Sequence, residues 1–521
     1  MRSKETCDRN INNSEVKEEV SKLRICLAQI VAVNVKNVLL VVYGLTLGMP
    51  TMLIPNLTGS DKDEPIVLDN DGVSWLGSLN FLSVPIGCLI SGTMASTLGR
   101  IRSMQIICIL FFGAFLLYYF ASQSWHIFFA LFLTGFSGGL LEAPTLIYTV
   151  EITDANLRGA LCSTSTAAIA IGVMVSFILG TVFPWRIMAI INGSIPITEL
   201  VLLMFIPESP YWLISRKEFQ RARENLAWLR GWCGLANIEE EFQNICNRLD
   251  AEQLQASMEK CSLNFLKEYC KPTFIKPYLM ICVTFVLANF GTPQINVYAV
   301  KLFELLKVSI NSYYATILVG VAEILGSILL IILVKPMGKR RLSFTTQLGI
   351  SIGFLITGIY AYNIGVLNFE TTAVGNSDYS WIPLFSIPSI AFFSYLMTFT
   401  LPWIIMGEVY PSDIRDNASG ISAATGYIIA FISNKCLLSL VEGITLPGVL
   451  WLYSVVAFLG IFVLYLILPE TEGKSLFEIT EHYAGRAKLD NKVGKKASKL
   501  THDIANNVIR ERIANKGFDE Y

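Results

Sequence analysis

Twelve apolar runs, each about the length of a membrane-crossing helix, dominate this sequence and constrain its fold more than any other feature. They lie at residues 28–54, 73–95, 103–121, 127–150, 160–183, 186–206, 277–303, 313–336, 343–363, 382–409, 417–441 and 449–468. Crossing a hydrocarbon core of about 30 Å takes roughly 20 apolar residues. Only 16% of the residues are charged, whereas soluble chains carry about 25%, so much of the surface must face lipid. We therefore predict an all-α membrane protein whose twelve transmembrane helices form two pseudo-symmetric six-helix bundles.

One charged stretch separates the sixth run from the seventh and divides the chain. It contains RKEFQRARENLAWLRG and EEEFQNICNRLD, which are polar and helix-patterned and so favour a soluble helical linker. The polar N-terminus is too long to be the start of a secretory signal and is interpreted as an arm. The predicted segments are an N-terminal arm at 1–26, a first bundle at 27–206, a linker at 207–276, a second bundle at 277–470 and a C-terminal tail at 471–521.

Basic residues in the short loops predict the orientation of the chain. Arg100, Arg102, Arg158 and the basic group at 335–341 fall on one side of the predicted membrane, together with the linker and the tail. By the positive-inside rule this side is the cytosol. The first loop on the opposite side is acidic and includes the glycosylation sequon that begins at Asn56. We predict a multi-pass plasma-membrane glycoprotein whose N- and C-termini are both cytosolic.

Three short motifs occur twice, at corresponding places in the two groups of runs. Gly99-Arg100 corresponds to Gly338-Lys339, Glu151 with Arg158 to Glu408 with Arg415, and Pro207-Glu208 to Pro469-Glu470. This order predicts a duplicated bundle with parallel repeats. We interpret the charged residues in and beside these motifs as a cytosolic gate built from ion pairs: Arg100, Glu151, Arg158, Lys339, Arg340, Glu408 and Arg415. The alternative for the basic members is that they are ordinary positive-inside anchors.

Four segments carry a resemblance to a known family. They are YTVEITDANLRG, PESPYWL, GEVYPSDIRDNASG and LPETEGKSLFEI, and they occur in the expected order within residues 27–480. These segments resemble the signatures of the sugar porters, the glucose-transporter-like branch of the major facilitator superfamily, and most of all its insect facilitated trehalose transporters. The resemblance implies the major facilitator fold, alternating access, and a central sugar site between the two bundles.

The sequence also departs from the sugar-porter pattern. Ser96 and Lys335 occupy the loop positions where the family usually has aspartate, and Leu131 replaces an arginine of the fourth helix. The family's Gln-Gln-x-Ser-Gly-Ile-Asn run in the seventh helix falls on residues 287–293, where only Gly291 is kept. We therefore expect the gate and the sugar site to differ from those of other members.

The remaining polar and aromatic residues of the helices indicate where a sugar would bind. The resemblance places Trp403 against the apolar face of the sugar and aligns Thr166 and Tyr427 with site residues of the family; for Trp403 the alternative is core packing or an interfacial anchor. Pro293 and Pro402 are expected to mark helix breaks. Since buried hydroxyls need partners, the predicted substrate-binding set is Trp403, Asn289, Gln294, Asn296, Tyr298, Thr166, Glu323 and Tyr427.

Ionisable residues within the apolar runs are unusual. Glu142, Glu199 and Glu323 each lie among aliphatic residues, where a charge costs at least about 2.5 kcal/mol. We interpret Glu323 as a site residue, with a protonated structural glutamate as the alternative. Lys36, Lys301 and Lys435 lie nearer the helix ends and are expected to snorkel to the membrane surface.

These features predict a transporter and not an enzyme, because the sequence shows no nucleophile with a base, no phosphate-cradling loop and no metal-ligand spacing. The preferred function is facilitated diffusion of a hexose or trehalose, since the first helix carries no acid for proton symport. A proton-coupled carrier of a different small solute and a transport-deficient nutrient sensor are the alternatives. The expected partners are the sugar and the lipid bilayer. No cofactor, metal, structural disulfide, nucleic acid or obligate protein partner is predicted.

Overall fold

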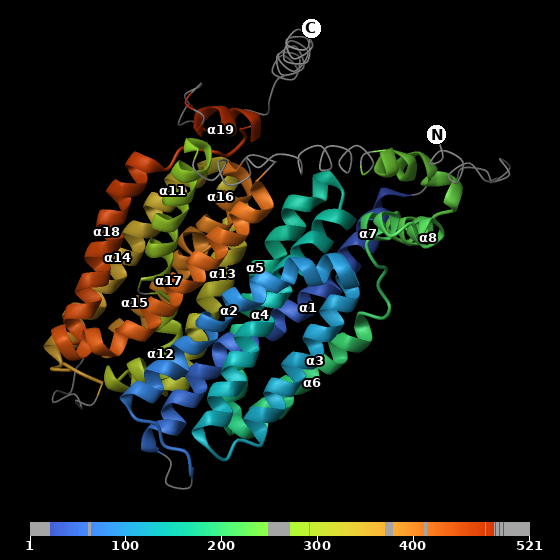
Figure 1. Cartoon of the computed structure of the whole chain (residues 1–521). Helices are drawn as coiled ribbons and strands as arrows, with labels where there is room; N and C mark the ends of the chain where they lie inside the picture. The colour runs from blue at the N-terminus through green and yellow to red at the C-terminus, as the bar shows by residue number, and fades with distance from the viewer. Residues whose placement is uncertain are drawn as a thin grey trace.

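The structure, a computed structural model, describes residues 21–60, 64–247, 249, 271–290, 292–369, 379–410, 414–474 and 476–483, together with residues 485, 489 and 493. The regular structure of these residues is helical, and twelve of the spans that they form are long and apolar enough to cross a membrane. The predicted fold class is confirmed (Figure 1). The limits given above for the five segments of the chain stay a prediction.

Six spanning helices form the first bundle. They are α1 (Lys22–Pro55), α2 (Asn70–Leu98), α3 (Arg100–Tyr119), α4 (Ser124–Ile152), α5 (Ala155–Val182) and α6 (Trp185–Leu202), and a π-helical turn, η1 (Asn56–Ser60), extends α1. Gly44 of α1 lies against Gly172 of α5, where an added side chain on either would collide with the partner backbone. Small residues at such crossings allow membrane helices to pack closely.

The second bundle repeats this order, but two of its spans are interrupted. Its elements are α11 (Pro272–Asn289) and α12 (Thr292–Leu305), which form one span, α13 (Ser312–Met337), α14 (Lys339–Asn363), then α15 (Ile382–Phe393), η3 (Ser394–Thr398) and α16 (Leu401–Val409), which form another, α17 (Arg415–Ile444) and α18 (Leu446–Ile467). New helices begin beside Pro293 and Pro402, as predicted. Proline lacks the N–H that a continuing helix needs, but it fits the first turn of a new one.

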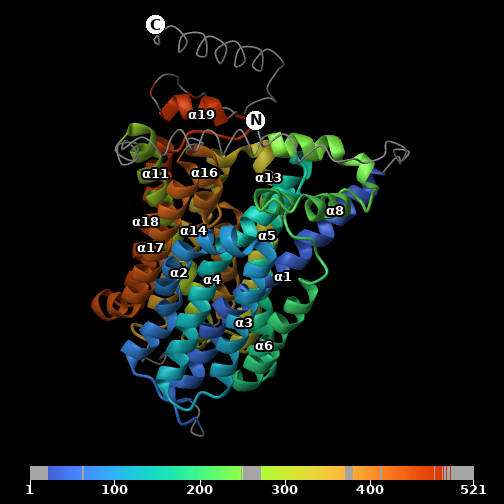
Figure 2. The same ribbon diagram turned by 45° about the vertical axis from the view of Figure 1, so that its right-hand side comes forward.

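Shorter helices lie together at one end of the bundles. The linker forms α7 (Pro210–Ser215), α8 (Phe219–Leu229), the turn η2 (Leu235–Asn237) and a helix at 239–247, which share a small apolar core. After the last span, α19 (Leu476–Tyr483) lies at the same end (Figure 2). We call this end the linker end, and the opposite end, where α12 lies, the far end.

Apolar packing joins the two bundles toward the far end. The core of the first bundle continues into the far-end half of the second, where it includes Val300, Leu437 and Val449. A separate core, which includes Ile405 and Tyr410, fills the linker-end half of the second bundle. In the described residues the bundles therefore share one core at the far end and have separate cores toward the linker end.

Candidate functional site

Five side chains from five helices meet well inside the membrane-spanning region, and we call them the central cluster: Tyr43 (α1), Glu142 (α4), Phe285 (α11), Trp403 (α16) and Tyr427 (α17). The Tyr427 hydroxyl donates to Glu142 Oε1 at 2.6 Å, and the Tyr43 hydroxyl lies within hydrogen-bonding reach of Tyr427. The Trp403 ring lies 5.5 Å from that of Tyr427 and 5.3 Å, edge-on, from that of Phe285. Because Tyr43 and Glu142 belong to the first bundle, the cluster bridges the two bundles.

Amide side chains stabilise the break between α11 and α12. Gln294 donates to the Ser433 hydroxyl and, at 3.1 Å, to the Asn289 carbonyl, which also accepts from Ser433 at 2.8 Å. The Asn289 amide donates to the Phe285 carbonyl at 2.9 Å. Both amides are buried. The Asn289 carbonyl has no N–H donor in its own helix, because the residue four positions on is Pro293, and Gln294 and Ser433 supply donors in its place. In this conformation the two predicted sugar ligands thus direct N–H groups at the protein itself.

The other predicted substrate residues lie on α5, α12 and α13. Asn296 Nδ2 donates to Glu323 Oε1 at 2.5 Å, while Glu323 Oε2 and Asn296 Oδ1 have no protein partner. Tyr298 lies against Gly77 of α2 with its hydroxyl unpartnered, and Thr166 is half-buried on α5. The contacts that the structure shows among the predicted residues therefore form three pairs: Trp403 with Tyr427, Asn289 with Gln294, and Asn296 with Glu323.

A set of polar and aromatic contacts, the far-end seam, closes the far end between the bundles. Lys435 Nζ lies 2.6 Å from Asp71 Oδ1 and 4.4 Å above the Trp75 ring. The Ser74 hydroxyl donates to the Lys435 carbonyl at 2.9 Å. The far-end seam consists of Thr51, Asp71, Ser74 and Trp75 of the first bundle with Asn296, Phe431 and Lys435 of the second. Lys435 thus reaches an anion of the other bundle, which the snorkelling prediction did not include.

Lys36 does not snorkel, and the prediction for this residue is wrong. Its side chain is 1% exposed, and Nζ donates to the Ser165 hydroxyl at 3.0 Å. The neighbouring Asn37 amide donates to the Thr164 hydroxyl at 2.8 Å. The close approach of α1 and α5 leaves the lysine no route to the membrane surface. The hydroxyl-rich run at 163–166 is the sequence signal for these partners.

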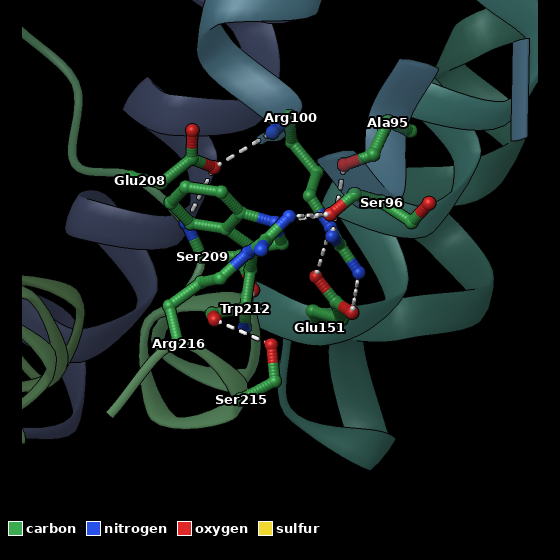
Figure 3. A network of polar contacts seen from close by, with 9 residues as sticks. All are labelled: Ala95, Ser96, Arg100, Glu151, Glu208, Ser209, Trp212, Ser215 and Arg216. Atoms are coloured by element: carbon green, nitrogen blue, oxygen red, sulfur yellow. Dashed lines mark hydrogen bonds and ion pairs between the residues drawn. The ribbon is translucent and has the colours of Figure 1, made fainter. Parts of the chain in front are cut away.

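Arg100, the first residue of α3, organises the linker end of the first bundle (Figure 3). Its guanidinium donates twice to the Glu151 carboxylate, at 2.7 and 3.0 Å, and once to the Ala95 carbonyl at 3.1 Å. Glu208 of the linker accepts from the backbone N–H groups of Arg100 and Ile101, both at 3.0 Å, where the helix dipole favours a carboxylate. Burial raises the pKa of Glu208, although these backbone bonds and the Arg100 charge oppose the rise.

Helix α7 attaches the linker to the carboxyl end of α2. The Trp212 indole N–H and the Arg216 guanidinium donate to the Ser96 carbonyl at 2.8 and 3.1 Å (Figure 3). Arg216 also donates to the Thr97 carbonyl at 2.8 Å. These carbonyls have no partner within their own helix, so the linker caps it.

The second bundle carries a counterpart of the Arg100 network. Lys339, the first residue of α14, places Nζ 2.6 Å from Glu408 Oε1 and 3.1 Å from Glu472 Oε2. Glu470 accepts from the backbone N–H groups of Lys339 and Arg340, both at 3.1 Å. The repeated sequence motifs therefore make equivalent contacts in the two bundles.

Glycine permits both networks, because the residue before each helix has a positive φ. The angle is +99° at Gly99 and +79° at Gly338, a conformation in which a β-carbon would be strained.

The remaining predicted residues of the gate and the glycosylation site are Arg340, Arg158, Arg415 and Asn56. The Arg340 guanidinium donates to the Tyr465 carbonyl at 2.5 Å. The side chains of Arg158 and Arg415 lie outside the described part of the chain. Asn56, in the predicted sequon, is half-buried and donates to the Met52 carbonyl at 2.7 Å.

Other sites for a solute or an ion are scarce. The described residues contain no group of three or more His, Cys, Asp or Glu side chains that could hold a metal ion. A pocket of about 220 Å³ lies between α14 and α15, with Ile356, Tyr360 and Tyr379 in its wall. Its lining is almost entirely apolar and it does not touch the central cluster, so it is no candidate for a polar solute.

Sequence reasoning missed three features of this arrangement. It identified the Pro-Glu repeat but not that Glu208 and Glu470 each accept from the first N–H groups of a spanning helix. It marked Glu142 as an unusual acid but not its bond to Tyr427. The far-end seam had no signal, because its residues come from chain positions more than 200 apart.

Two similar six-helix bundles that meet at a polar and aromatic cluster, beside interrupted spans, define a membrane carrier of the two-bundle type. The chain matches the family model described as "Sugar (and other) transporter" over residues 49–483, and it belongs to that family. It is thus a membrane transporter, and the sugar-porter assignment made from its motifs is confirmed.

Curated relatives and solved structures agree with this membership. The chain is 29% identical over 424 residues to the facilitated trehalose transporter Tret1-2 homolog of Drosophila sechellia, covering 80% of this chain and 83% of the relative. It is 28% identical over 422 residues to facilitated trehalose transporter Tret1 of Polypedilum vanderplanki, covering 80% of each. For Tret1 of Drosophila mojavensis, 26% identical over 429 residues, the match covers 81% of this chain but only 48% of the relative.

Among solved structures, the xylose transporter XylE from E. coli in a partially occluded inward-open conformation has a TM-score of 0.69. The sequence identity is 19%, and the match covers 86% of this chain and 100% of that one. The inward-open conformation of the same transporter gives 0.67 at 19% identity, covering 87% and 99%. At such identities the likeness shows the fold alone.

Proposed function

We propose that this chain moves a sugar, a hexose or trehalose, across the plasma membrane by facilitated diffusion through alternating access. The central cluster carries the proposal, because Trp403 and Tyr427 present aromatic rings beside the Glu142 carboxyl where the bundles meet. Aromatic rings cover the apolar side of a sugar, and polar groups replace the water that its hydroxyls lose. Family membership and the names of the trehalose-transporting relatives support the same class of solute.

The linker end is cytosolic in this proposal, and Asn56 is an extracellular glycosylation site. The basic residues Arg100, Lys339 and Arg340 lie at the linker end, in agreement with the positive-inside rule. The structure then represents a state whose extracellular end is closed by the far-end seam. Opening to the outside requires that the seam break while the cytosolic end closes, where we place the seven predicted gate residues.

Vesicles that contain the purified protein test the proposal directly. We expect saturable uptake of radiolabelled glucose or trehalose, equal in both directions and unaffected by a proton gradient. Trp403→Ala is expected to reduce this uptake at least 10-fold, whereas Trp381→Ala, at an exposed position at the start of α15, serves as the matched control. Equal uptake by the two variants would remove Trp403 from the site.

Proton coupling is the first alternative, and the free Oε2 of buried Glu323 is the observation that favours it. A carboxyl bonded only through Oε1 to Asn296 retains an atom that can hold a proton. If an inward proton gradient drives sugar accumulation, and Glu323→Gln abolishes the accumulation while exchange at equal sugar concentrations persists, coupling replaces facilitated diffusion.

A transport-deficient sensor is the second alternative. It is favoured by the two span-seven amides, Asn289 and Gln294, which bond the protein itself. A sensor would bind sugar, detected as a change in tryptophan fluorescence, without exchanging it across the vesicle membrane. Exchange of bound sugar at any rate above that of empty vesicles excludes this function.

A further inference from the structure

Glu142 differs from Glu199 and Glu323, the other acids within the apolar runs, because its carboxyl bonds a residue of the other bundle. Hydrogen bonds that join the two bundles include three in the far-end seam. Another joins Tyr427 to Glu142. Tyr427 precedes Lys435 by eight residues on α17, about 12 Å along the helix toward the linker end. Among the described residues, this bond therefore lies deeper between the bundles than the contacts of the far-end seam.

The surroundings of Glu142 contain no counter-ion. Tyr427 of α17, Tyr43 of α1 and Cys88 of α2 face its carboxyl, and no ion pair involves it among the residues that the structure describes. Ionisable residues inside the membrane are expensive and usually face a functional cavity. Glu142 and Trp403 both keep some exposed surface, and Glu142 points at the bundle boundary, so a small molecule at this boundary can reach them.

Glu199 provides the contrast. It is fully buried on α6, where its carboxyl interacts with Cys108 of α3, and neither of its oxygens has a protein partner. Both helices belong to the first bundle. Burial of an acid therefore does not by itself indicate a binding role, and the position of Glu142 at the boundary is what separates the two residues.

We propose that Glu142 binds the substrate: its carboxyl accepts a hydrogen bond from a hydroxyl of a neutral sugar while Trp403 covers the apolar face of the ring. This inference rests on the sugar-carrier function proposed above. In the structure the Tyr427 hydroxyl donates to Glu142 Oε1. A sugar hydroxyl that takes its place exchanges one hydrogen bond for another, so binding costs little and breaks the bond from Tyr427 to Glu142 that joins the bundles. The first bundle thereby contributes a sugar ligand that residues 287–293 of span seven do not supply.

Sugar exchange by the full chain in vesicles tests this role, with Glu199→Gln as the matched control. We expect Glu142→Gln to raise the KM for glucose or trehalose about 10-fold or more, since the substitution replaces one carboxyl oxygen by an NH2 group, which donates hydrogen bonds but cannot accept one. A series of monodeoxy sugars should include one analogue that the unsubstituted protein and Glu142→Gln transport with equal KM, because it lacks the hydroxyl that contacts Glu142. Glu199→Gln should leave the KM values of the whole series unchanged.

Tyr427→Phe gives an independent measurement that keeps the ring beside Trp403. Removing the competing hydroxyl leaves Glu142 free for the sugar, so the KM for the parent sugar should fall about 3-fold. An unchanged or higher KM for Tyr427→Phe overturns the proposal that a sugar hydroxyl replaces the Tyr427 hydroxyl at Glu142. This test does not depend on whether Glu142→Gln can be recovered in folded form.

The possible failures are distinguishable. If the unsubstituted protein exchanges sugar and Glu142→Gln behaves like Glu199→Gln, the inference is wrong and the proposed function stands. If the unsubstituted protein neither binds nor exchanges any sugar, both are wrong. If glucosamine competes at least 10-fold better than glucose and Glu142→Gln removes this preference, the carboxyl recognises a cation, and the role with a neutral sugar is overturned.

Discussion

The two ends of the molecule use charged side chains in different ways. At the far end, Lys435 of the second bundle pairs with Asp71 of the first, across the boundary between them, in addition to the Arg186–Glu64 pair within the first bundle. At the linker end, Arg100 pairs with Glu151 and Lys339 with Glu408, and each of these pairs lies within one bundle. The Lys435–Asp71 pair is also more exposed than the Arg100–Glu151 pair, since 73% of the Asp71 side chain is accessible compared with 15% for Glu151.

This difference separates two tasks. Contacts that cross the boundary set the relative position of the bundles, whereas contacts within a bundle stabilise each one as a unit. Alternating access needs rigid bundles and a boundary that opens at low cost. We therefore infer that the linker-end pairs seen here determine mainly stability, and that the far-end seam determines mainly which side of the carrier is open.

The largest expected effect comes from Arg100→Ala. It leaves Glu151 and the backbone oxygen of Ala95 without their partner, and we expect a loss of about 2–4 kcal/mol of stability. Thermal unfolding in detergent measures this loss. Arg221→Ala, which breaks an exposed pair with Glu218 of the linker, is the control and should change stability by less than about 0.5 kcal/mol. Equal effects of the two variants would contradict the view that the Arg100 network stabilises the bundle.

The next effect is on the distribution of conformations. Asp71→Asn or Lys435→Met removes an exposed ion pair worth about 0.5–1 kcal/mol, which should raise the population open at the far end by about 2- to 5-fold. Distances between spin labels at two exposed far-end positions, Val67 and Ile444, report this population. Arg100→Ala should leave the distance distribution as it was. If the distance distribution shifts with Arg100→Ala and not with Asp71→Asn, the linker-end pair and not the far-end seam determines which side is open.

A smaller effect concerns acid at the linker end. Burial raises the pKa of Glu208 in the folded protein above its unfolded value of about 4.3. Between these two values the folded state binds more protons, so stability should increase as the pH falls through the raised pKa. Glu208→Gln cannot titrate, and its melting temperature should lack this increase on acidification from neutral pH. If the unsubstituted protein and Glu208→Gln respond alike, another group is responsible.

The far end should respond to acid in the opposite direction. Burial alone would raise the pKa of Glu64, but its bonds to the Arg186 guanidinium and the Trp185 indole outweigh burial and lower the pKa. The stabilisation from this carboxylate is complete above the unfolded value of about 4.3 and is lost as the pH falls through the lowered pKa. In Glu64→Gln the melting temperature should fall less below that pH, and Glu218→Gln in an exposed pair is the control. A steeper fall of the melting temperature in Glu64→Gln would contradict the lowered pKa of Glu64.

Much of the fold was predictable from local sequence. The apolar runs, the prolines at the two broken spans and the repeated motifs at Arg100 and Lys339 all act through neighbouring residues. The candidate site was harder to predict from the sequence, because a polar residue such as Gln294 has the same sequence pattern whether it binds a sugar or stabilises a helix break. That Gln294 and the other predicted residues bind a sugar stays a prediction.

By itself, the sequence determined that the chain crosses the membrane twelve times and that its two halves are built alike. Length and apolar composition decide this, because a run of about 20 apolar residues crosses the hydrocarbon core as a helix, which satisfies its backbone hydrogen bonds internally. Tertiary structure alone decided that Lys36 is buried against Ser165, that Lys435 meets Asp71, and that Tyr427 bonds Glu142. These contacts depend on which faces of distant helices meet, and the free energy of such packing is not a property of either segment alone.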